Sequence, residues 1–152
     1  LMETFLVQEL GYGWDEVHDE AEILEHAVSD RMLDRIDAKL GHPTRDPHGD
    51  PIPGPDGAVE SHRTSLLLAE ADPGTYVVLR VSDADPEMLR YFDSVGISLD
   101  SRVRVVARRD FAGVISVAVG RPGEPDDPSN PDTGIQVELG NPADEAIWVV
   151  AS

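Results

Sequence analysis

The sequence predicts an α+β protein, in which a short helical part comes first and a small β-barrel follows. Up to about residue 40, apolar residues recur at the three- and four-residue spacing of amphipathic helices. From Leu66 onward the pattern has a period of two and is rich in β-branched residues, as in strands. A stretch rich in Pro, Gly and Asp separates the two patterns. We therefore expect a helical domain at 1–41, a linker at 42–65 and a barrel domain at 66–152.

Composition excludes several classes of protein. The chain has 152 residues, with 30 acidic and 12 basic side chains and a formal charge of −18, so its surface field repels nucleic acid and anionic membranes. The absence of cysteine excludes disulfides, zinc–thiolate sites and a cysteine nucleophile, and fits a cytoplasmic protein. No apolar run approaches the roughly 18 residues of a membrane span. Glu3 and Glu9 interrupt the first apolar segment, so no signal peptide is visible.

Three short helices are predicted in the first 41 residues. The first covers 1–10 and ends at Gly11, because glycine supports the turned backbone beyond a helix end. The second begins at Asp15 as N-cap, with Trp14 as its flanking hydrophobic residue, and runs to about Ala27. The third follows an N-cap at Ser29. Its apolar side and its end are given by Met32, Leu33, Ile36, Leu40 and Gly41.

Helices this short bury little area by themselves and need a partner surface. That partner is either a second copy of the chain or a segment upstream of Leu1, and the start of the chain inside a helical pattern leads us to expect such a segment. We expect a homodimer built on apolar residues of the first helices. The residues proposed for this interface are Leu6, Leu10, Leu24 and Val28.

The segment VHDEAEILEHAVS, residues 17–29, carries the strongest chemical signal. It places two imidazoles and two carboxylates on neighbouring turns of one helix face. These residues are His18, Glu22, Glu25 and His26. Such a set binds a divalent transition metal, and the lack of sulfur favours manganese or ferrous iron. The alternative is a solvated acidic helix with two incidental histidines.

The stretch after Gly41 offers one more candidate pair. The sequence HPTRDPHGDPIPGPDG favours turns over helix or sheet, so it is first of all a linker. Within it, Asp46 and His48 hold a carboxylate and an imidazole on a stiff local frame around Pro47.

The rest of the chain reads as strands of a small barrel. The predicted strands are 75–82, 101–108, 114–120, 134–139 and 146–151, with a short further strand at 66–68. A short helix at 85–92 starts with Pro86 in its first turn. Five or six short strands with one helical insert indicate a barrel of SH3-like type. Residues 121–134 form a polar excursion with nothing apolar to bury.

The order VHDEAEILEHAVSD, DPHGDPIPGPDG and small barrel resembles the diphtheria toxin repressor family of metal-dependent transcriptional repressors. Among its members, the sequence is most similar to the manganese-responsive ones with a C-terminal SH3-like, FeoA-like domain. The resemblance implies the dimerisation and SH3-like part of a repressor of metal homeostasis that uses Mn²⁺ or Fe²⁺. It also implies that operator DNA is bound by a winged helix-turn-helix domain upstream of Leu1.

The resemblance assigns the metal ligands to two sites. Glu22, Glu25 and His26 match the primary site, whose other ligands come from the DNA-binding domain. In iron-responsive members a cysteine stands at the position of Glu22, and a carboxylate there favours manganese.

Glu3 and His18 match a second, ancillary site, which the family completes from its SH3-like domain. Asp83 and Asp85 lie just after the first barrel strand, near where that completing ligand is expected, and Asp83 is the candidate we name. Asp46 and His48 match positions that some manganese-responsive members use at the ancillary site.

Two other functions compete with this interpretation. A di-iron carboxylate enzyme needs a Glu-x-x-His pair on each of two helices, and neither that pattern nor His-Glu-x-x-His occurs, so we expect no enzyme. A peptide-binding SH3-type adaptor needs a groove lined with aromatic residues. The barrel offers only Tyr76, Tyr91, Phe92, Phe111 and Trp148, several of which must fill its core. In a variant of this function, the barrel holds the chain's own PIPGP segment.

Overall fold

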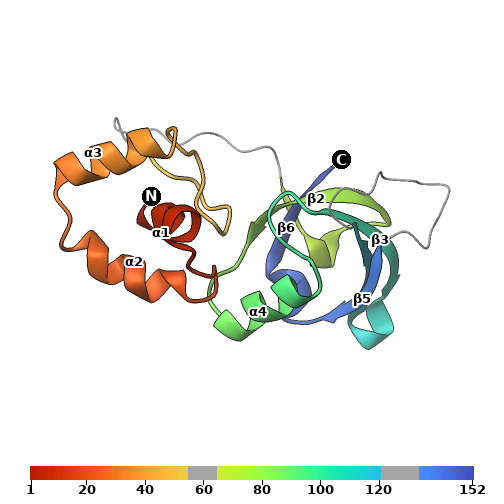
Figure 1. The fold of residues 1–152 in the computed structure, drawn as a ribbon. Coiled ribbons are helices and arrows are strands. Elements are labelled where there is room, and N and C mark those ends of the chain that lie inside the picture. The colour runs from red at the N-terminus through yellow and green to blue at the C-terminus, as the bar shows by residue number, and fades with distance from the viewer. Residues whose placement is uncertain (55–64, 121–133) are drawn as a thin grey trace. The chain divides into compact units, whose positions relative to one another are not determined.

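The computed structural model describes residues 1–54, 65–120 and 134–152. The chain divides into two compact units, and each is treated by itself below. The first unit holds Leu1–Ser61 together with Asp83–Leu89, and the second holds His62–Ser82 together with Arg90–Ser152. The first unit is helical, whereas the second is built on a β-sheet (Figure 1).

Three helices make up most of the first unit: α1 (Met2–Leu10), α2 (Val17–Glu25) and α3 (Asp30–Lys39). As predicted, α1 ends at Gly11, which has the left-handed φ of 75°. Ser29 caps α3, because its Oγ accepts the Met32 N–H at 3.2 Å. The predicted cap of α2 at Asp15 is wrong. The Glu16 N–H donates to the Gly13 carbonyl at 3.2 Å, and this turn delays the helix so that Glu16 becomes its N-cap.

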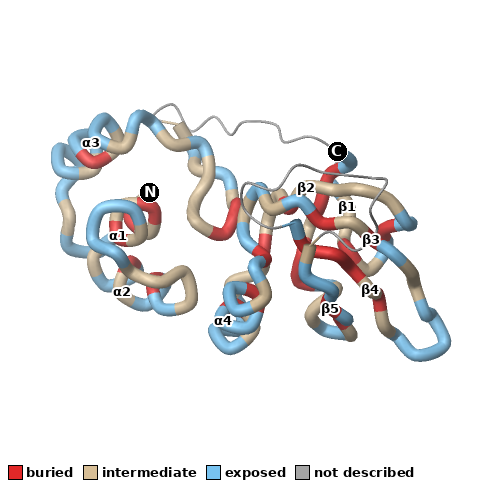
Figure 2. The backbone as a smooth tube through the Cα atoms, turned by 45° about the vertical axis from the view of Figure 1, so that its right-hand side comes forward, coloured by how far each residue is buried: buried red, intermediate tan, exposed pale blue. Residues whose placement is uncertain are grey.

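One small hydrophobic core joins the three helices. Each helix contributes at least one residue that is at most 5% exposed. Figure 2 shows buried positions on all three helices. The fully buried members are Met2, Leu6, Val17, Ala21 and Ile36. The helices therefore bury part of their apolar surface within one chain, and they hold the side chains of α1 and α2 in a fixed relation.

The segment after α3 folds into a tight hairpin in the first unit. Arg45 and Pro51 form an antiparallel bridge. One carboxylate oxygen of Asp46 accepts the backbone N–H groups of His48 at 2.9 Å and Asp50 at 3.0 Å. Residues 42–54 thus have a defined fold. Of the rest of the predicted linker at 42–65, residues 55–64 lie outside the described residues. The division into domains at residues 41 and 66 stays a prediction.

Six antiparallel strands form the sheet of the second unit, in the order β1-β6-β2-β3-β4-β5. The strands are β1 (Leu66–Leu67), β2 (Gly74–Val81), β3 (Arg102–Arg109), β4 (Val114–Val119), β5 (Ile135–Gly140) and β6 (Ile147–Ala151). Short 3₁₀ turns lie at Leu68–Glu70, Asp110–Ala112 and Ala143–Glu145, and helix α4 covers Pro86–Ser94. The five longer strands lie within one residue of their predicted bounds.

The sheet curves because its pairing register shifts at two points. One shift lies between Val78 and Arg80 in β2, and the other lies between Val105 and Ala107 in β3. Irregularities of this kind bend strands and increase their twist. The predicted α+β class with an SH3-like, FeoA-like barrel is confirmed. The predicted excursion at 121–134 lies almost entirely outside the described residues.

Burial alternates along part of β3 and of β5, whereas β4 is buried continuously from Val117 to Val119 (Figure 2). The most deeply buried include Val103, Val105, Ile115, Val117, Val119 and Leu139. Within the described ranges, every helix is too short or too polar to cross a membrane.

Candidate metal centre

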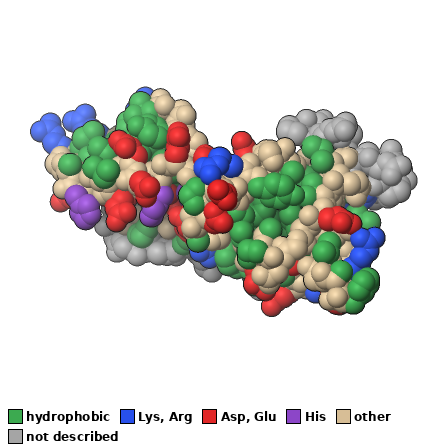
Figure 3. Space-filling view, turned by 90° about the horizontal axis from the view of Figure 1, so that it is seen from below, with side chains coloured by type: hydrophobic (Ala, Val, Ile, Leu, Met, Phe, Trp, Pro, Cys, Tyr) green, Lys and Arg blue, Asp and Glu red, His purple; other side chains and the backbone are tan. Residues whose placement is uncertain are grey.

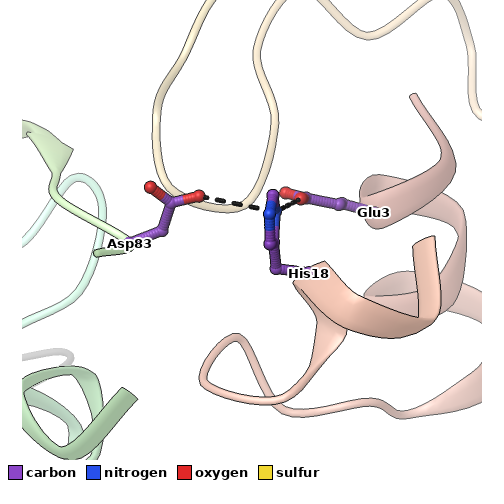
Figure 4. Close-up of side chains that lie close together, drawn as sticks. All are labelled: Glu3, His18 and Asp83. Atoms are coloured by element: carbon purple, nitrogen blue, oxygen red, sulfur yellow. Dashed lines mark hydrogen bonds and ion pairs between the residues drawn. The ribbon is translucent and has the colours of Figure 1, made fainter. Parts of the chain in front are cut away.

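Three side chains from separate segments of the first unit meet at one point (Figure 4). Glu3 lies on α1, His18 on α2 and Asp83 in the segment that follows β2. The Glu3 Oε1 atom is 2.9 Å from His18 Nδ1. The same His18 nitrogen is 3.8 Å from Asp83 Oδ2.

The hairpin at 42–54 adds a second imidazole. His48 is completely buried, and its Nδ1 lies 3.3 Å from Glu3 Oε2 and 3.9 Å from Asp83 Oδ2. Asp46 lies beside it, and one donor atom each of Glu3, Asp46 and His48 falls within 4.8 Å of the others. The same limit holds for Glu3, His18 and Asp83. We call these five residues the Glu3 cluster.

The spacing of these donor atoms fits a metal ion. Ligands at about 2.1 Å from an ion lie roughly 3.0 Å apart on an octahedral edge and roughly 3.4 Å apart on a tetrahedral edge. The contacts of Glu3 with the two imidazoles, 2.9 and 3.3 Å, match these edges. Carboxylate oxygens with imidazole nitrogens suit manganese and iron.

A second observation supports this fit. Among the described residues, Glu3 Oε2 and His48 Nδ1 are buried and lack a hydrogen bond of good geometry. Burial of such polar atoms without a partner costs free energy. A cation bound between them would satisfy both atoms, so the cluster has the features expected of a metal centre.

The pKa values of the cluster reflect its dense negative charge. Burial lowers the pKa of His48, but Glu3, the Trp14 carbonyl and Asp46 together outweigh it and raise this pKa to about 9. The pKa of Glu3 is lowered, chiefly by the nearby His48 imidazole, against the opposing effect of burial. Glu3 likewise raises the pKa of His18. Burial raises the pKa of Asp46. The cluster therefore attracts positive charge, whether as protons or as a cation.

The structure does not bring together the three residues predicted for the primary metal site. Glu22 and Glu25 are exposed on α2, and His26 is exposed directly after its last residue. Glu22 Oε2 approaches only His18, at 4.0 Å from Nε2. Acidic and histidine side chains lie together on this part of the first unit (Figure 3). Among the described residues, no group of three donor atoms within 4.8 Å of one another includes Glu22, Glu25 or His26.

The four predicted interface residues lie in different environments. Leu6 belongs to the core and is 1% exposed, whereas Leu10 is 59% exposed. Leu24 and Val28 are partly buried against the core. Ile23 and Met32 are also exposed, at 66% and 48%, although neither was predicted for the interface.

Sequence reasoning also missed a contact of Trp14. The backbone carbonyl of Trp14 lies 2.7 Å from Nε2 of His48. The two rings are stacked, with centroids 6.2 Å apart and planes inclined by 12°. From its position in the sequence, Trp14 was expected only to flank a helix, because a backbone carbonyl leaves no signal in the sequence.

Two family models match the chain. Residues 1–54 match the iron dependent repressor, metal binding and dimerisation domain. Residues 66–124 match the FeoA domain. The Glu3 cluster draws four of its five residues from the first match.

Known proteins resemble the chain over longer stretches. It is 31% identical over 117 residues to the iron-dependent repressor IdeR of Mycobacterium leprae, a match that covers 69% of this chain and 51% of that protein. A solved structure described as a manganese-dependent transcriptional repressor in complex with manganese is 62% identical, with a TM-score of 0.87, and the match covers 99% of this chain and 66% of that one. A second, a manganese-dependent transcriptional repressor, is 61% identical with a TM-score of 0.82, over 99% of this chain and 76% of that one. The chain spans about half the length of the curated relatives it matches.

Proposed function

The chain belongs to the diphtheria toxin repressor family of metal-dependent repressors, and from this premise we propose that it is the metal-sensing and dimerising part of such a repressor. The intact protein would bind operator DNA when loaded with Mn²⁺ or Fe²⁺, and so would control metal homeostasis. The observation that carries the proposal is the Glu3 cluster, which gathers carboxylate and imidazole donors at metal-ligand spacing. In this function the chain is not an enzyme.

Manganese is the favoured metal. The relatives that are 61% and 62% identical are described as manganese-dependent. The chain has no thiolate to offer, so its donors are carboxylates and imidazoles, and oxygen-rich sites suit manganese. Iron remains the second candidate, because the curated relatives are iron-dependent repressors.

The ligands of the Glu3 cluster explain how metal binding can be sensed. Glu3, His18 and Asp83 lie on three segments that are far apart in the chain. Side chains that share one ion hold their segments at fixed separations, so ion binding favours one arrangement of α1, α2 and the 83–89 segment. We assign Asp83 and His48 to this ancillary site, with Asp46 shaping the hairpin that carries His48.

We assign Glu22, Glu25 and His26 to the primary site of the intact repressor. Their exposure on α2 leaves them accessible to a further part of the protein. Ligands from the upstream winged helix-turn-helix domain would complete the site and so fix that domain in its DNA-binding position. In this proposal the chain contributes three ligands of the primary site and all ligands of the ancillary one.

We propose a homodimer through the helical unit. Leu10, Ile23 and Met32 are exposed apolar side chains there, and large exposed apolar residues mark interaction surfaces when they lie together. Light scattering at micromolar concentration should give twice the mass of the chain, and Leu10→Glu should shift the equilibrium toward monomer. A monomeric wild type would contradict the assembly.

The adaptor alternative has less support. Phe92 is fully buried, and the Tyr76 hydroxyl donates to the Asp72 carbonyl at 2.8 Å. Trp148 carries the guanidinium of Arg80 over its ring at 4.4 Å. Three of the five aromatic residues of the barrel are thus engaged within the unit, which leaves Tyr91 and Phe111 as the exposed ones.

The function is tested by DNA binding of the intact polypeptide and of this chain. The intact protein should retard its operator in a gel-shift assay with Mn²⁺, and the triple variant Glu22→Ala, Glu25→Ala, His26→Ala should not. This chain alone should bind no duplex DNA with or without Mn²⁺, because its charge of −18 is repulsive. Metal-independent operator binding by the intact protein would contradict the proposal.

A further inference from the structure

We propose that Trp14 is a positioning residue of the metal centre, which holds His48 so that Nδ1 is its ligating atom. The proposal rests on the metal-sensing function above and deepens it. It concerns how this chain prepares a ligand, rather than which ligands it has.

The hydrogen bond between His48 and Trp14 sets the tautomer. A backbone carbonyl only accepts hydrogen bonds, so the Nε2 atom that lies 2.7 Å from it must carry the hydrogen. In a neutral imidazole the other nitrogen then presents its lone pair. That nitrogen, Nδ1, is the atom that faces Glu3 Oε2 at 3.3 Å. Metal-ligating histidines commonly donate their second ring N–H in this way.

The stacked indole sets the ring orientation. The two ring planes are inclined by only 12° with centroids 6.2 Å apart, so the Trp14 ring lies parallel to the imidazole and beside it. A half-turn of the imidazole about its Cβ–Cγ axis would break the hydrogen bond to the Trp14 carbonyl and turn Nδ1 away from Glu3. The backbone of His48 is held as well, because its N–H donates to Asp46 Oδ1 at 2.9 Å. Complete burial of His48 leaves its ring little room for other rotamers.

The first test compares two substitutions of Trp14 by Mn²⁺ calorimetry on the chain. Trp14→Leu removes the flat ring, and affinity should fall about 10- to 100-fold, the usual loss when a partner that orients a ligand is removed. Trp14→Phe keeps an aromatic ring beside His48 and should stay within about threefold of the wild type. Equal affinity of Trp14→Leu and the wild type would overturn the proposal.

The second test observes the ligating atom directly. Nitrogen-15 NMR of histidine side chains in the wild-type chain loaded with diamagnetic Cd²⁺ should show His48 bound through Nδ1 with a hydrogen on Nε2. Binding through Nε2 would overturn the proposal, and this measurement stands even if Trp14→Leu fails to fold.

A third readout uses fluorescence. Trp14 and Trp148 are the two tryptophans of the chain, so Trp148→Phe leaves Trp14 as the sole indole. Mn²⁺ should change its emission in a saturable way, and the added substitution His48→Ala should abolish the change. No change of Trp14 emission at saturating Mn²⁺ would count against the contact.

These tests separate the two proposals. If the wild-type chain binds Mn²⁺ and needs Glu3 and His18, but Trp14→Leu binds equally well, then only the positioning role is wrong. If the wild-type chain binds no Mn²⁺, both the metal-sensing function and the positioning role fall.

Discussion

Helix α2 carries ligands of two kinds, and their difference shows what makes a metal centre within one chain. His18, in its first turn, meets Glu3 and Asp83, and Glu3 in turn contacts the hairpin residue His48. Glu22 and Glu25, one and two turns later on the same helix, point to no comparable partners in the described part of the chain. Helical spacing aligns donors along one face, but a coordination sphere needs donors from several directions.

Burial distinguishes the partners of His18 from the surroundings of Glu22, although the two α2 side chains are themselves similarly exposed, at 59% and 65%. The side chain of Glu3 is 13% exposed and His48 is 0% exposed, whereas that of Glu22 is 65% exposed. Donors that are already dehydrated and fixed lose less freedom on binding an ion. The Glu3 cluster should therefore bind metal in this chain, and the α2 triad should bind it only when further ligands are supplied.

The largest expected effect is the loss of Mn²⁺ binding in Glu3→Gln. Glu3 contacts both imidazoles, so its substitution should cost at least about 100-fold in affinity, more than the 10- to 100-fold typical of orienting residues. His18→Ala should act in the same direction. Titration calorimetry of the chain should show at most about one appreciable site in the wild type.

The matched control is Glu9→Gln, the same change on the same helix. Glu9 pairs with Lys39 at 3.7 Å and lies outside the cluster, so Mn²⁺ affinity should stay within about twofold. A similar loss in Glu9→Gln and Glu3→Gln would show that general negative charge, rather than the cluster, attracts the ion.

The next effect is a loss of stability of the metal-free chain at alkaline pH. The pKa of His48 is about 9 in the folded chain, against an ordinary histidine value of 6.5, so the folded state holds this proton more tightly than the unfolded state does. The resulting stability is fully present below pH 6.5 and is lost as pH rises toward 9, by at most about 3 kcal/mol. Urea unfolding in the presence of a chelator, at pH 6.5 and pH 9, measures it. A pH dependence that persists unchanged in His48→Gln would contradict this origin.

Much of the fold follows from local sequence signals. Gly11 and Ser29 mark helix ends because one supports a left-handed backbone and the other caps free N–H groups. The barrel strands follow from period-two alternation, which burial on one face requires. The start of α2 after Glu16 could not be predicted. It depends on a backbone hydrogen bond from Glu16 to Gly13 rather than on the side chain of Asp15.

The candidate site was only partly accessible to sequence reasoning. Residue spacing draws attention to α2, yet the structure assembles its cluster around Glu3, which looks like an ordinary helix residue. The resemblance to a known family named all five residues of the Glu3 cluster as candidates. The pairing of His48 with Trp14 emerged from the structure alone. Contacts between segments 34 positions apart, mediated by a backbone carbonyl, have no local signature.

A smaller effect is expected from Ser29→Ala, which tests whether stability and metal binding are separable. Loss of the cap on α3 should lower the free energy of unfolding by about 1 kcal/mol. Mn²⁺ affinity should be unchanged, because α3 supplies no donor to the Glu3 cluster. Ser29→Asp keeps an acceptor and should recover most of the stability. A loss of Mn²⁺ affinity in Ser29→Ala would show that the helical core and the cluster are coupled.

The smallest effect in this chain is expected from substituting the α2 triad. Glu22 is exposed and lies 4.0 Å from His18, so Glu22→Cys should change the free energy of unfolding by less than about 0.5 kcal/mol. Mn²⁺ affinity of the chain should change less than about threefold in calorimetry.

In the intact repressor the same substitution should change the preference among metals far more, because a thiolate is a softer ligand than a carboxylate. There, operator binding should respond to Fe²⁺ or Zn²⁺ at lower concentrations relative to Mn²⁺. An unchanged order of metals in the intact Glu22→Cys protein would remove Glu22 from the sensing site, and the contrast along α2 would then be between ligands and surface residues.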